Sequence, residues 1–495
     1  MPGKTKVFFI HPKENSGHFS PPLGLAYLAA VAREKNCEIK TIDLSARYAE
    51  YSDKDILNSV DSFRPDIVCV SVNTLYASQA LKMINLLADS PALKIAGGPH
   101  PTILPQESLE RGFDVVVRGE GEETFAELID FARGEKKLEN ILGISFRKGK
   151  KVIGNSARPP IENLDSLPFP AIDLFNEKDY AKSKRASSNF AVINSSRGCP
   201  YNCIFCATSL VQGKRFRFMS AGKVMKEIEE YRKRYGTEIF YFTDDSFSFN
   251  RERVMELCKL ILNKNLKIKW HCATRVDKVD FELLKKMKNA GCGSITYGLE
   301  SGNPKTLEKI RKGISLQQTR DALILTKNAG IAANANFILG FPWENAKDIK
   351  KTREFMSEIS PYVSNFTPSY VLTPFPGSKL FEEYRSKNRF DGWWNSEEKK
   401  YFVESEEIPV FQKNFYHYPP ILLDIFFTYP EEAKNEYGKT VDFIVSHNIK
   451  NSQGILQFSL SLSTYHISKI LFSISPRLEI NFFSAMRKIK NSAKI

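Results

Sequence analysis

The sequence predicts an α/β protein: a doubly wound parallel sheet, then a partial barrel of six β/α units, then a mainly helical C-terminal region. Three observations support this fold class. Short β-branched runs alternate with helical patterns twice, over residues 5–132 and again from residue 190, as is typical of parallel sheets. A proline-rich stretch separates the two series. The 495 residues also exceed what one hydrophobic core usually holds.

The first series contains five strand candidates with helical patterns between them. Such a series predicts a Rossmann-like or flavodoxin-like sheet, whose ligand crevice lies beyond the carboxyl ends of its strands. The strand candidates are KVFFIHP (6–12), EIKTIDLS (38–45), DIVCVSV (66–72), LKIAGGP (93–99) and the start of DVVVRGEGEETFAELIDFA (114–132).

The residues that follow change in character. ISFRKGKKVIG predicts a hairpin, and RPPIENLDSLPFPAIDLF is rich in proline and predicts an extended linker. We therefore expect an N-terminal domain over 1–142, a hairpin and linker over 143–185, a barrel over 186–385 and a C-terminal substrate-related region over 386–495.

The second series predicts a partial (β/α)6 TIM-like barrel. In such barrels the chemistry comes from residues at the carboxyl ends of the strands. The six strand candidates are NFAVINSS, EIFYFTDDSF, KIKWHCATRV, GSITYGLES, ANANFILGF and FTPSYVLTPF.

Composition limits the partners and the compartment. The net charge of +14 would suit an anionic partner, but no basic run with interleaved aromatics predicts nucleic-acid binding. The start, MPGKTKVFFIHPKE, predicts a first strand and not a signal peptide, and no apolar stretch is long enough to span a membrane. Eight cysteines that are mostly scattered along the chain do not predict a secreted disulfide scaffold, so we expect a reducing cytoplasm.

The tail from residue 453 mixes apolar stretches with a basic end. It predicts either helices that pack on the barrel or an amphipathic segment at a membrane interface. The second alternative would place the protein at the inner face of the membrane, near a lipid-like or anionic substrate.

Three cysteines lie within RGCPYNCIFC (197–206), directly after the first barrel strand: Cys199, Cys203 and Cys206. A zinc site is one alternative, but structural zinc sites usually take their ligands in separated pairs. Iron–sulfur clusters take thiolates from loops of this kind. Three thiolates would bind three irons of a cubane cluster and leave the fourth iron open, as catalysis requires.

RGCPYNCIFC resembles the signature of radical S-adenosylmethionine (SAM) enzymes, and so do FTDDSF (242–247), YGLESG (297–302), NFILGFPWE (336–344) and TPFPGSKLFEEY (373–384). The resemblance implies that Cys199, Cys203 and Cys206 hold a 4Fe-4S cluster and are catalytic together with Glu300. It implies SAM contacts for Phe205, Asp244, Glu300 and Gly340, with one acid of the Asp244–Asp245 pair facing SAM and the other structural. Arg275 ends a strand and either contacts SAM or forms an ion pair.

The first domain resembles the cobalamin-binding domain of class B radical SAM proteins, which include methylases and the anaerobic magnesium-protoporphyrin ester cyclase. The matching segments are PPLGLAYLAA (21–30), SVNT (71–74), GGPHPT (97–102) and VRGEGEETF (117–125). The D-x-H-x-x-G motif is absent from the loop after the first strand, so we expect no histidine ligand to cobalt from this loop. The resemblance implies cobalamin contacts for Ser71, Thr74, Gly97, Gly98, His100, Gly119 and Glu120.

Three functions remain open at this stage. The first is a cobalamin-dependent methyltransferase that acts on an unactivated carbon of a small molecule and takes electrons from a donor such as flavodoxin or ferredoxin. The second uses the same cofactors for oxidative cyclisation or carbon–carbon bond formation in tetrapyrrole or lipid biosynthesis. The third is a non-catalytic cobalamin or redox sensor.

Overall fold

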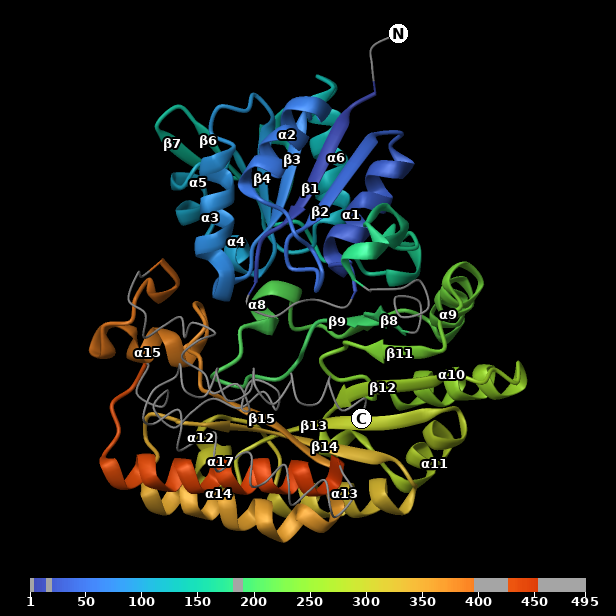
Figure 1. Ribbon diagram of the computed structural model, residues 1–495, viewed down its shortest axis with the longest axis vertical. Helices are drawn as coiled ribbons and strands as arrows, with labels where there is room; N and C mark the ends of the chain where they lie inside the picture. Colours follow the sequence, from blue (N-terminus) through green and yellow to red (C-terminus); the bar gives the residue numbers. More distant parts are fainter. Residues whose placement is uncertain (1–3, 15–19, 181–189, 396–425, 453–495) are drawn as a thin grey trace, which may run out of the picture.

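The computed structural model describes residues 4–14, 20–180, 190–395 and 426–452, and its two large sheets lie one above the other in Figure 1. The N-terminal sheet has seven strands in the order β2-β1-β3-β4-β5-β6-β7. The first five are parallel and follow the flavodoxin-like order, so the predicted fold class is confirmed here. The strands are β1 (Lys6–His11), β2 (Glu38–Asp43), β3 (Ile67–Ser71), β4 (Leu93–Gly97), β5 (Val115–Val117), β6 (Ile144–Lys148) and β7 (Lys151–Gly154).

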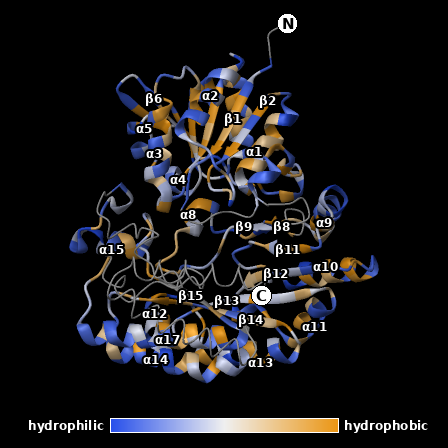
Figure 2. Ribbon diagram, viewed as in Figure 1, coloured by the Kyte–Doolittle hydropathy of each residue, from blue (hydrophilic) through white to orange (hydrophobic). Residues whose placement is uncertain are grey.

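Helices cover both faces of this sheet because its central strands are hydrophobic on both faces. Val7 and Phe9 of β1 cluster with residues of α1 (Leu23–Glu34) and α6 (Glu122–Ala132). Phe8 and Ile10 point to the other face and cluster with α2 (Asp53–Phe63) and α3 (Ala77–Leu86). Figure 2 shows the resulting band of hydrophobic strands between the helices. Two short helices, α4 (Pro99–Ile103) and α5 (Pro105–Glu110), follow β4.

The predicted hairpin forms, but it belongs to the first sheet. β6 pairs antiparallel with β5, and β7 pairs antiparallel with β6. The sheet therefore continues past the expected boundary at residue 142. The domain limits themselves stay a prediction.

The second sheet has six parallel strands in the order β15-β14-β13-β12-β11-β8. This arrangement confirms the predicted partial barrel. The strands are β8 (Phe190–Ile193), β11 (Ile239–Phe242), β12 (Lys269–Thr274), β13 (Cys292–Glu300), β14 (Ala332–Leu339) and β15 (Asn365–Val371).

Five helices cover the outer face of this sheet, and alternate strand residues such as Phe240, Trp270 and Tyr297 are buried among them. The intervening strand residues point to the concave face, because successive side chains of a strand alternate. The outer helices are α9 (Ala221–Tyr235), α10 (Arg251–Asn263), α11 (Phe281–Asn289), α13 (Leu316–Asn328) and α14 (Ala346–Ile359); α8 (Thr208–Gln212), α12 (Pro304–Lys309) and α15 (Lys379–Asn388) lie in connections.

The described part of the C-terminal region closes one edge of the barrel sheet. α17 (Glu431–Ser452) lies beside α14 (Figure 1). The Asn448 side chain accepts the N–H of Phe366 on edge strand β15 (2.9 Å) and donates to the carbonyl of the same residue (2.7 Å). One amide side chain thus replaces a neighbouring strand at this point.

The C-terminal region also contacts the N-terminal domain. Trp393 and Trp394 are buried in the same hydrophobic cluster as Phe8 and Val70 of the first sheet, as expected for packing residues. The tail from residue 453, for which membrane contact was considered, lies outside the described residues. Among the described helices, none has the length and apolar character that a membrane span needs.

Candidate active site

The cysteine loop is held by close backbone contacts. It follows the two-residue strand β9 (Ser196–Arg197), which pairs with β10 (Arg217–Phe218). Gly198 has a φ of +88°, and a Cβ at this position would lie 2.1 Å from the carbonyl oxygen of Arg215. Only glycine fits this close approach. The N–H of Cys199 then donates to the carbonyl of Gly213 (3.1 Å).

The three thiols of the loop are free and only partly buried. Burial raises the pKa of the Cys199 and Cys203 thiols. The sulfur of Cys206 accepts the N–H of Thr208 (3.4 Å), a type of hydrogen bond that tunes cluster sulfurs. Within the described residues no three His, Cys, Asp or Glu converge on a single ion. A cubane takes one thiolate per iron, so a donor set of three separate thiols fits a cluster better than one ion.

The two acids after β11 differ in their surroundings. Asp244 is buried, and it accepts hydrogen bonds from both Ser195 and Ser196, including the Ser195 hydroxyl at 2.8 Å. Asp245, next to it, keeps part of its surface accessible, while partial desolvation of its carboxyl group, together with the charge of Asp244, raises its pKa to about 6. Asp244 is therefore held by the two serines, and which of the two acids faces SAM stays a prediction.

Arg275 supports the cysteine loop from β12. Its Nε bonds to Asp277 (2.8 Å), and its terminal nitrogens donate to the carbonyls of Lys312 (2.9 Å) and Gly313 (3.3 Å). Its guanidinium also stacks 3.6 Å from the ring centre of Tyr201, within the cysteine loop. Of the two predicted alternatives, the structure has the ion pair.

Glu300, at the end of β13, adopts an unusual backbone conformation. Its φ is +66°, a region that non-glycine residues rarely occupy, and the strand register shifts between Gly298 and Glu300. The carboxylate lies 2.6 Å from the ammonium of Lys312, and both side chains are largely buried. A Cβ at Gly298 would lie 2.6 Å from Oε1 of Glu300, so Gly298 makes room for this carboxylate. Backbone strain of this kind is often found at functional sites.

Aromatic residues line the approach to the cysteines from β14. The Phe205 ring lies edge-on to Phe341, with 6.4 Å between the ring centres. Gly340, just before Phe341, has a φ of +86°, and its carbonyl accepts the hydroxyl of Tyr429. The structure thus brings Phe205 and Gly340 to neighbouring segments, and their contact with SAM stays a prediction.

A cavity of about 220 Å³ lies between the two sheets. Its walls include Ser71, Gly97, Gly98 and Gly119 from the carboxyl ends of the first sheet, and Arg197 and Gln212 from the cysteine loop. A Cβ at Gly97 or Gly119 would meet no atom within 4 Å, so these backbones are open to a large ligand. At Gly98 a Cβ would lie 2.9 Å from the carbonyl oxygen of Val72, so glycine is needed there for the backbone turn after β4.

Comparison with known proteins agrees with this arrangement. The Radical SAM superfamily model matches residues 193–356, and the B12 binding domain model matches residues 13–129. Uncharacterized methyltransferase PH0819 of Pyrococcus horikoshii is 37% identical over 387 residues, which cover 76% of this chain and 82% of that protein. The chain belongs to the cobalamin-binding radical SAM family.

One further curated protein and one solved structure are also similar to this chain. The anaerobic magnesium-protoporphyrin IX monomethyl ester cyclase of Cereibacter sphaeroides is 28% identical over 77% of this chain, but the match spans only 64% of that protein. The solved structure of the cobalamin-dependent SAM radical enzyme OxsB, with aqua-cobalamin and SAM bound, has a TM-score of 0.68 at 18% identity, over 98% of this chain and 75% of that one. Identity this low shows the fold alone.

Membership of the cobalamin-binding radical SAM family makes the protein an enzyme, so the sensor alternative does not hold. The two family models imply a 4Fe-4S cluster and SAM for the barrel, and cobalamin for the first domain. The free thiols of the cysteine loop fit the cluster, and the backbones of Gly97 and Gly119 leave the cavity beside that loop open for the approach of a ligand.

Three predicted cobalamin residues have other partners in this member of the cobalamin-binding radical SAM family. Thr74 and His100 are buried and lie 3.3 Å apart through Oγ1 and Nδ1, and neither lines the cavity. Burial lowers the pKa of His100 to about 4, so the ring is neutral there. Glu120 does line the cavity, but its carboxylate pairs with Arg217 (2.7 Å) and accepts the N–H of Ile161 (2.7 Å).

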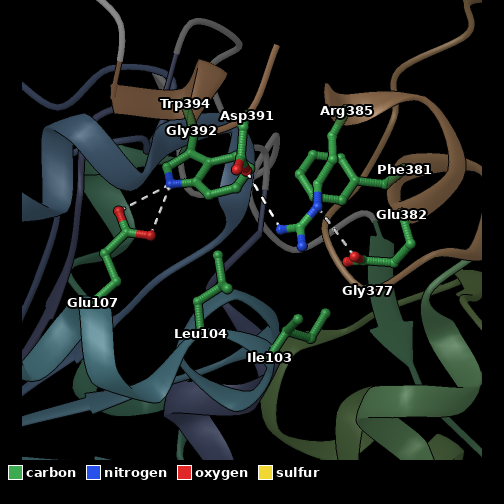
Figure 3. Close-up of a pocket in the computed structure, with 10 residues that line it drawn as sticks. All are labelled: Ile103, Leu104, Glu107, Gly377, Phe381, Glu382, Arg385, Asp391, Gly392 and Trp394. Atoms are coloured by element: carbon green, nitrogen blue, oxygen red, sulfur yellow. Dashed lines mark hydrogen bonds and ion pairs between the residues drawn. The ribbon is translucent and has the colours of Figure 1, made fainter. Parts of the chain in front are cut away.

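A second cavity, of about 540 Å³, contains no predicted site residue (Figure 3). It lies where α4 and α5 meet α15 and the segment Asp391–Trp394. The indole N–H of Trp394 donates to the Glu107 carboxylate (2.9 Å), and the edge of the His100 ring faces the indole. Arg385 is paired with Glu382 (3.2 Å) and Asp391 (3.6 Å). The two contacts of Trp394 fasten the C-terminal region to the first domain.

Sequence reasoning missed the residues of the concave face of the barrel. Tyr241, His271 and Ser294 are direct neighbours on three adjacent strands. The Tyr241 ring stacks on His271 (4.8 Å), and His271 Nδ1 lies 2.7 Å from the Ser294 hydroxyl. Tyr241 is 43% exposed although β11 is an interior strand. The alternation of polar with apolar residues in these strands is the signal that could have found them.

Proposed function

We propose that the protein is a cobalamin-dependent radical SAM methyltransferase that acts on a carbon atom of a small molecule. The observation that carries this proposal is the 37% identity, over 82% of its length, to a protein named as a methyltransferase. The cavity beside the cysteine loop supports it, because methyl transfer needs the two cofactor sites close together. When bound, the cluster and SAM supply a radical that removes a hydrogen atom, and cobalamin carries the methyl group.

Within this proposal the residues bind, orient and exclude water. Cys199, Cys203 and Cys206 ligate the cluster. Glu300, held by Lys312, and Asp245 bind the polar groups of SAM, while Phe205 and Gly340 lie against its adenine. Arg275 does not contact SAM itself. It positions the cysteine loop by stacking on Tyr201, and it positions Lys312 by its hydrogen bonds to the carbonyls of Lys312 and Gly313.

The cobalamin contacts form the second part of the assignment. Ser71, Gly97, Gly98 and Gly119 line the cavity for cobalamin. Thr74 and His100 support the fold behind the cavity, and Glu120 holds the barrel domain against the first domain through its ion pair with Arg217. The expected absence of a histidine ligand to cobalt from the loop after β1 remains part of this proposal; His18 of that loop lies outside the described residues.

The concave face of the barrel favours a substrate with hydrogen-bonding groups. Tyr241, His271, Ser294, Asn334 and Asn336 are partly accessible, polar and uncharged, so this face suits a polar small molecule better than a purely hydrocarbon one. Action in the cytoplasm, an electron donor of the flavodoxin or ferredoxin type, and contact of the tail with a membrane stay predictions.

Oxidative cyclisation without net methyl transfer is the second candidate, and the similarity to the cyclase of Cereibacter sphaeroides favours it. One experiment separates the two functions without knowledge of the substrate. The reconstituted protein is incubated anaerobically with cobalamin, a strong reductant and SAM that carries a trideuterated methyl group.

A methyltransferase is expected to form S-adenosylhomocysteine and to move the label to the cobalamin fraction, as read by mass spectrometry. The Cys199→Ala, Cys203→Ala, Cys206→Ala variant serves as the control, because it should lose formation of 5′-deoxyadenosine. Formation of 5′-deoxyadenosine by the wild type without any S-adenosylhomocysteine would contradict methyl transfer and favour the cyclase class.

A further inference from the structure

Two arginines of the barrel domain meet two glutamates of the first domain in one ion network. Arg197 pairs with Glu122 through both terminal nitrogens, the longer contact being 3.2 Å, and lies 3.6 Å from Glu120. Arg217 lies 2.7 Å from Glu120. Glu120 lies between β5 and α6, Glu122 is the first residue of α6, and both arginines come from the β9–β10 pair.

The network is buried. The exposed side-chain fractions are 12% for Arg197, 9% for Glu122, 3% for Arg217 and 11% for Glu120. Burying charges costs desolvation energy, so a buried ion pair is weak evidence for stability and is better attested as a device that fixes register. The fork of Arg197 on Glu122 has the planar geometry that fixes orientation as well as distance.

The network is also joined directly to the cluster ligands. Only Gly198 separates Arg197 from Cys199, and the close approach of Gly198 to Arg215 leaves this backbone no room to move independently. The N–H of Gly198 donates to the side chain of Gln212 (3.1 Å). Arg197, Gln212 and Glu122 all line the 220 Å³ cavity. A ligand in this cavity therefore touches Arg197, two residues before the cluster ligand Cys199, and Gln212, which accepts the N–H of the intervening Gly198.

We infer that Arg197 and Glu122 are positioning residues that couple the cavity of the first domain to the cysteine loop. Cobalamin in the cavity fixes the Arg197–Glu122 fork, and the fork fixes the backbone at Cys199. Because coupling between two binding sites is reciprocal, the state of the cluster changes the affinity for cobalamin by the same factor. This inference rests on the cofactor assignment and does not depend on methyl transfer.

The test measures the affinity for cobalamin in two states of the full-length protein. Hydroxocobalamin is titrated anaerobically into protein with the reconstituted cluster and into iron-free protein, and Kd is read from the cobalamin absorbance. For the wild type we expect the two Kd values to differ by about fivefold or more. Glu122→Gln keeps the shape of the side chain but removes its charge, and Arg197→Lys keeps the charge but removes the fork. In each variant we expect the ratio of the two Kd values to fall toward one.

The ratio of the two Kd values distinguishes coupling from a general structural effect, because loosening of the cavity would change both values alike. Glu162→Gln is the matched control: Glu162 pairs with Arg215 at 2.9 Å, but the two side chains are 57% and 76% exposed, so the ratio should stay at the wild-type value. A wild-type ratio of one, or an unchanged ratio in both variants, would overturn the coupling alone.

Two other outcomes would also decide against the proposal. If Glu122→Gln and Arg197→Lys both fail to fold, as judged by circular dichroism, the pair is a structural one and the positioning role is wrong. If only one of the two variants folds, the ratio of its two Kd values decides: a ratio near one supports the coupling, and the wild-type ratio overturns it. Wild-type protein that binds no hydroxocobalamin would overturn the coupling together with the cofactor assignment, whereas failure of the label-transfer experiment alone would leave the coupling intact.

Discussion

Substitution of Gly198 by alanine should damage the cysteine loop far more than the same change at an ordinary left-handed glycine. Gly198 has a φ of +88°, and the new Cβ would lie 2.1 Å from the carbonyl oxygen of Arg215. Ordinary contacts of a Cβ lie at 3.4–4 Å, so the backbone at position 198 or the backbone of Arg215 would have to move. Gly236, which ends α9 with a φ of +67° and has no atom within 4 Å of its added Cβ, is the matched control.

The two substitutions share one contribution to the loss in free energy of unfolding, and Gly198→Ala has a second. A left-handed backbone costs alanine about 1–2 kcal/mol at either position. The overlap at Gly198 adds the cost of forcing atoms into filled space, about 1–3 kcal/mol. We therefore expect Gly198→Ala to lower the free energy of unfolding by about 2–5 kcal/mol and Gly236→Ala by about 1–2 kcal/mol.

Urea unfolding of the iron-free proteins, followed by circular dichroism, measures this difference without a contribution from metal binding. Iron content after reconstitution gives a second measure, since Gly236→Ala should bind iron like the wild type and Gly198→Ala should not. Equal losses of stability in the two variants, or full iron binding by Gly198→Ala, would refute the conclusion that close packing at Gly198 holds the loop.

Two further changes test buried polar groups. Burial raises the pKa of Glu227 to about 7 from an ordinary 4.5, so its folded state holds an unfavourable charge at high pH. Wild-type stability should fall by up to about 3 kcal/mol as pH rises from 4.5 through 7. In Glu227→Gln the free energy of unfolding should no longer fall over this pH range. If the difference in free energy of unfolding between the variant and the wild type stays constant from pH 5 to 8, Glu227 does not have the raised pKa. Asn448→Ala leaves the backbone groups of Phe366 without their partner, and we expect it to cost about 1–3 kcal/mol in urea unfolding. Asn451→Ala removes only the longer bonds from Nδ2 of Asn451 to the carbonyls of Val363 (3.4 Å) and Ser364 (3.1 Å), from a more exposed position, and should cost less; the reverse order would speak against edge closure by Asn448.

Local spacing predicted much of the site. The three cysteines share one loop, and Gly97 and Gly98 end a strand, so their meeting at the carboxyl edges of the two sheets follows from chain order and from the direction of parallel strands. The strand pattern also contained a signal about the acids. Phe240, Phe242 and Asp244 belong to the same alternate set, which predicts that Asp244 is the buried acid.

The partners of isolated polar residues could not be predicted in this way. Glu107 receives its hydrogen bond from Trp394, 287 positions later, and Glu120 pairs with Arg217 across the two domains. His100 resembles a pocket residue in sequence, but its burial and its edge-on contact with Trp394 make it part of the interior. Such contacts depend on how the two domains dock, and no short pattern in the sequence encodes that.

The hairpin that extends the first sheet has a further consequence for how molecules of this protein meet. β7 is the last strand of its sheet, and its outer edge offers backbone groups to which a strand of another chain can add. Lys148, Lys150 and Lys151 are exposed around the hairpin turn. Two copies that approached edge to edge would bring these like charges together, so the hairpin limits aggregation by strand addition.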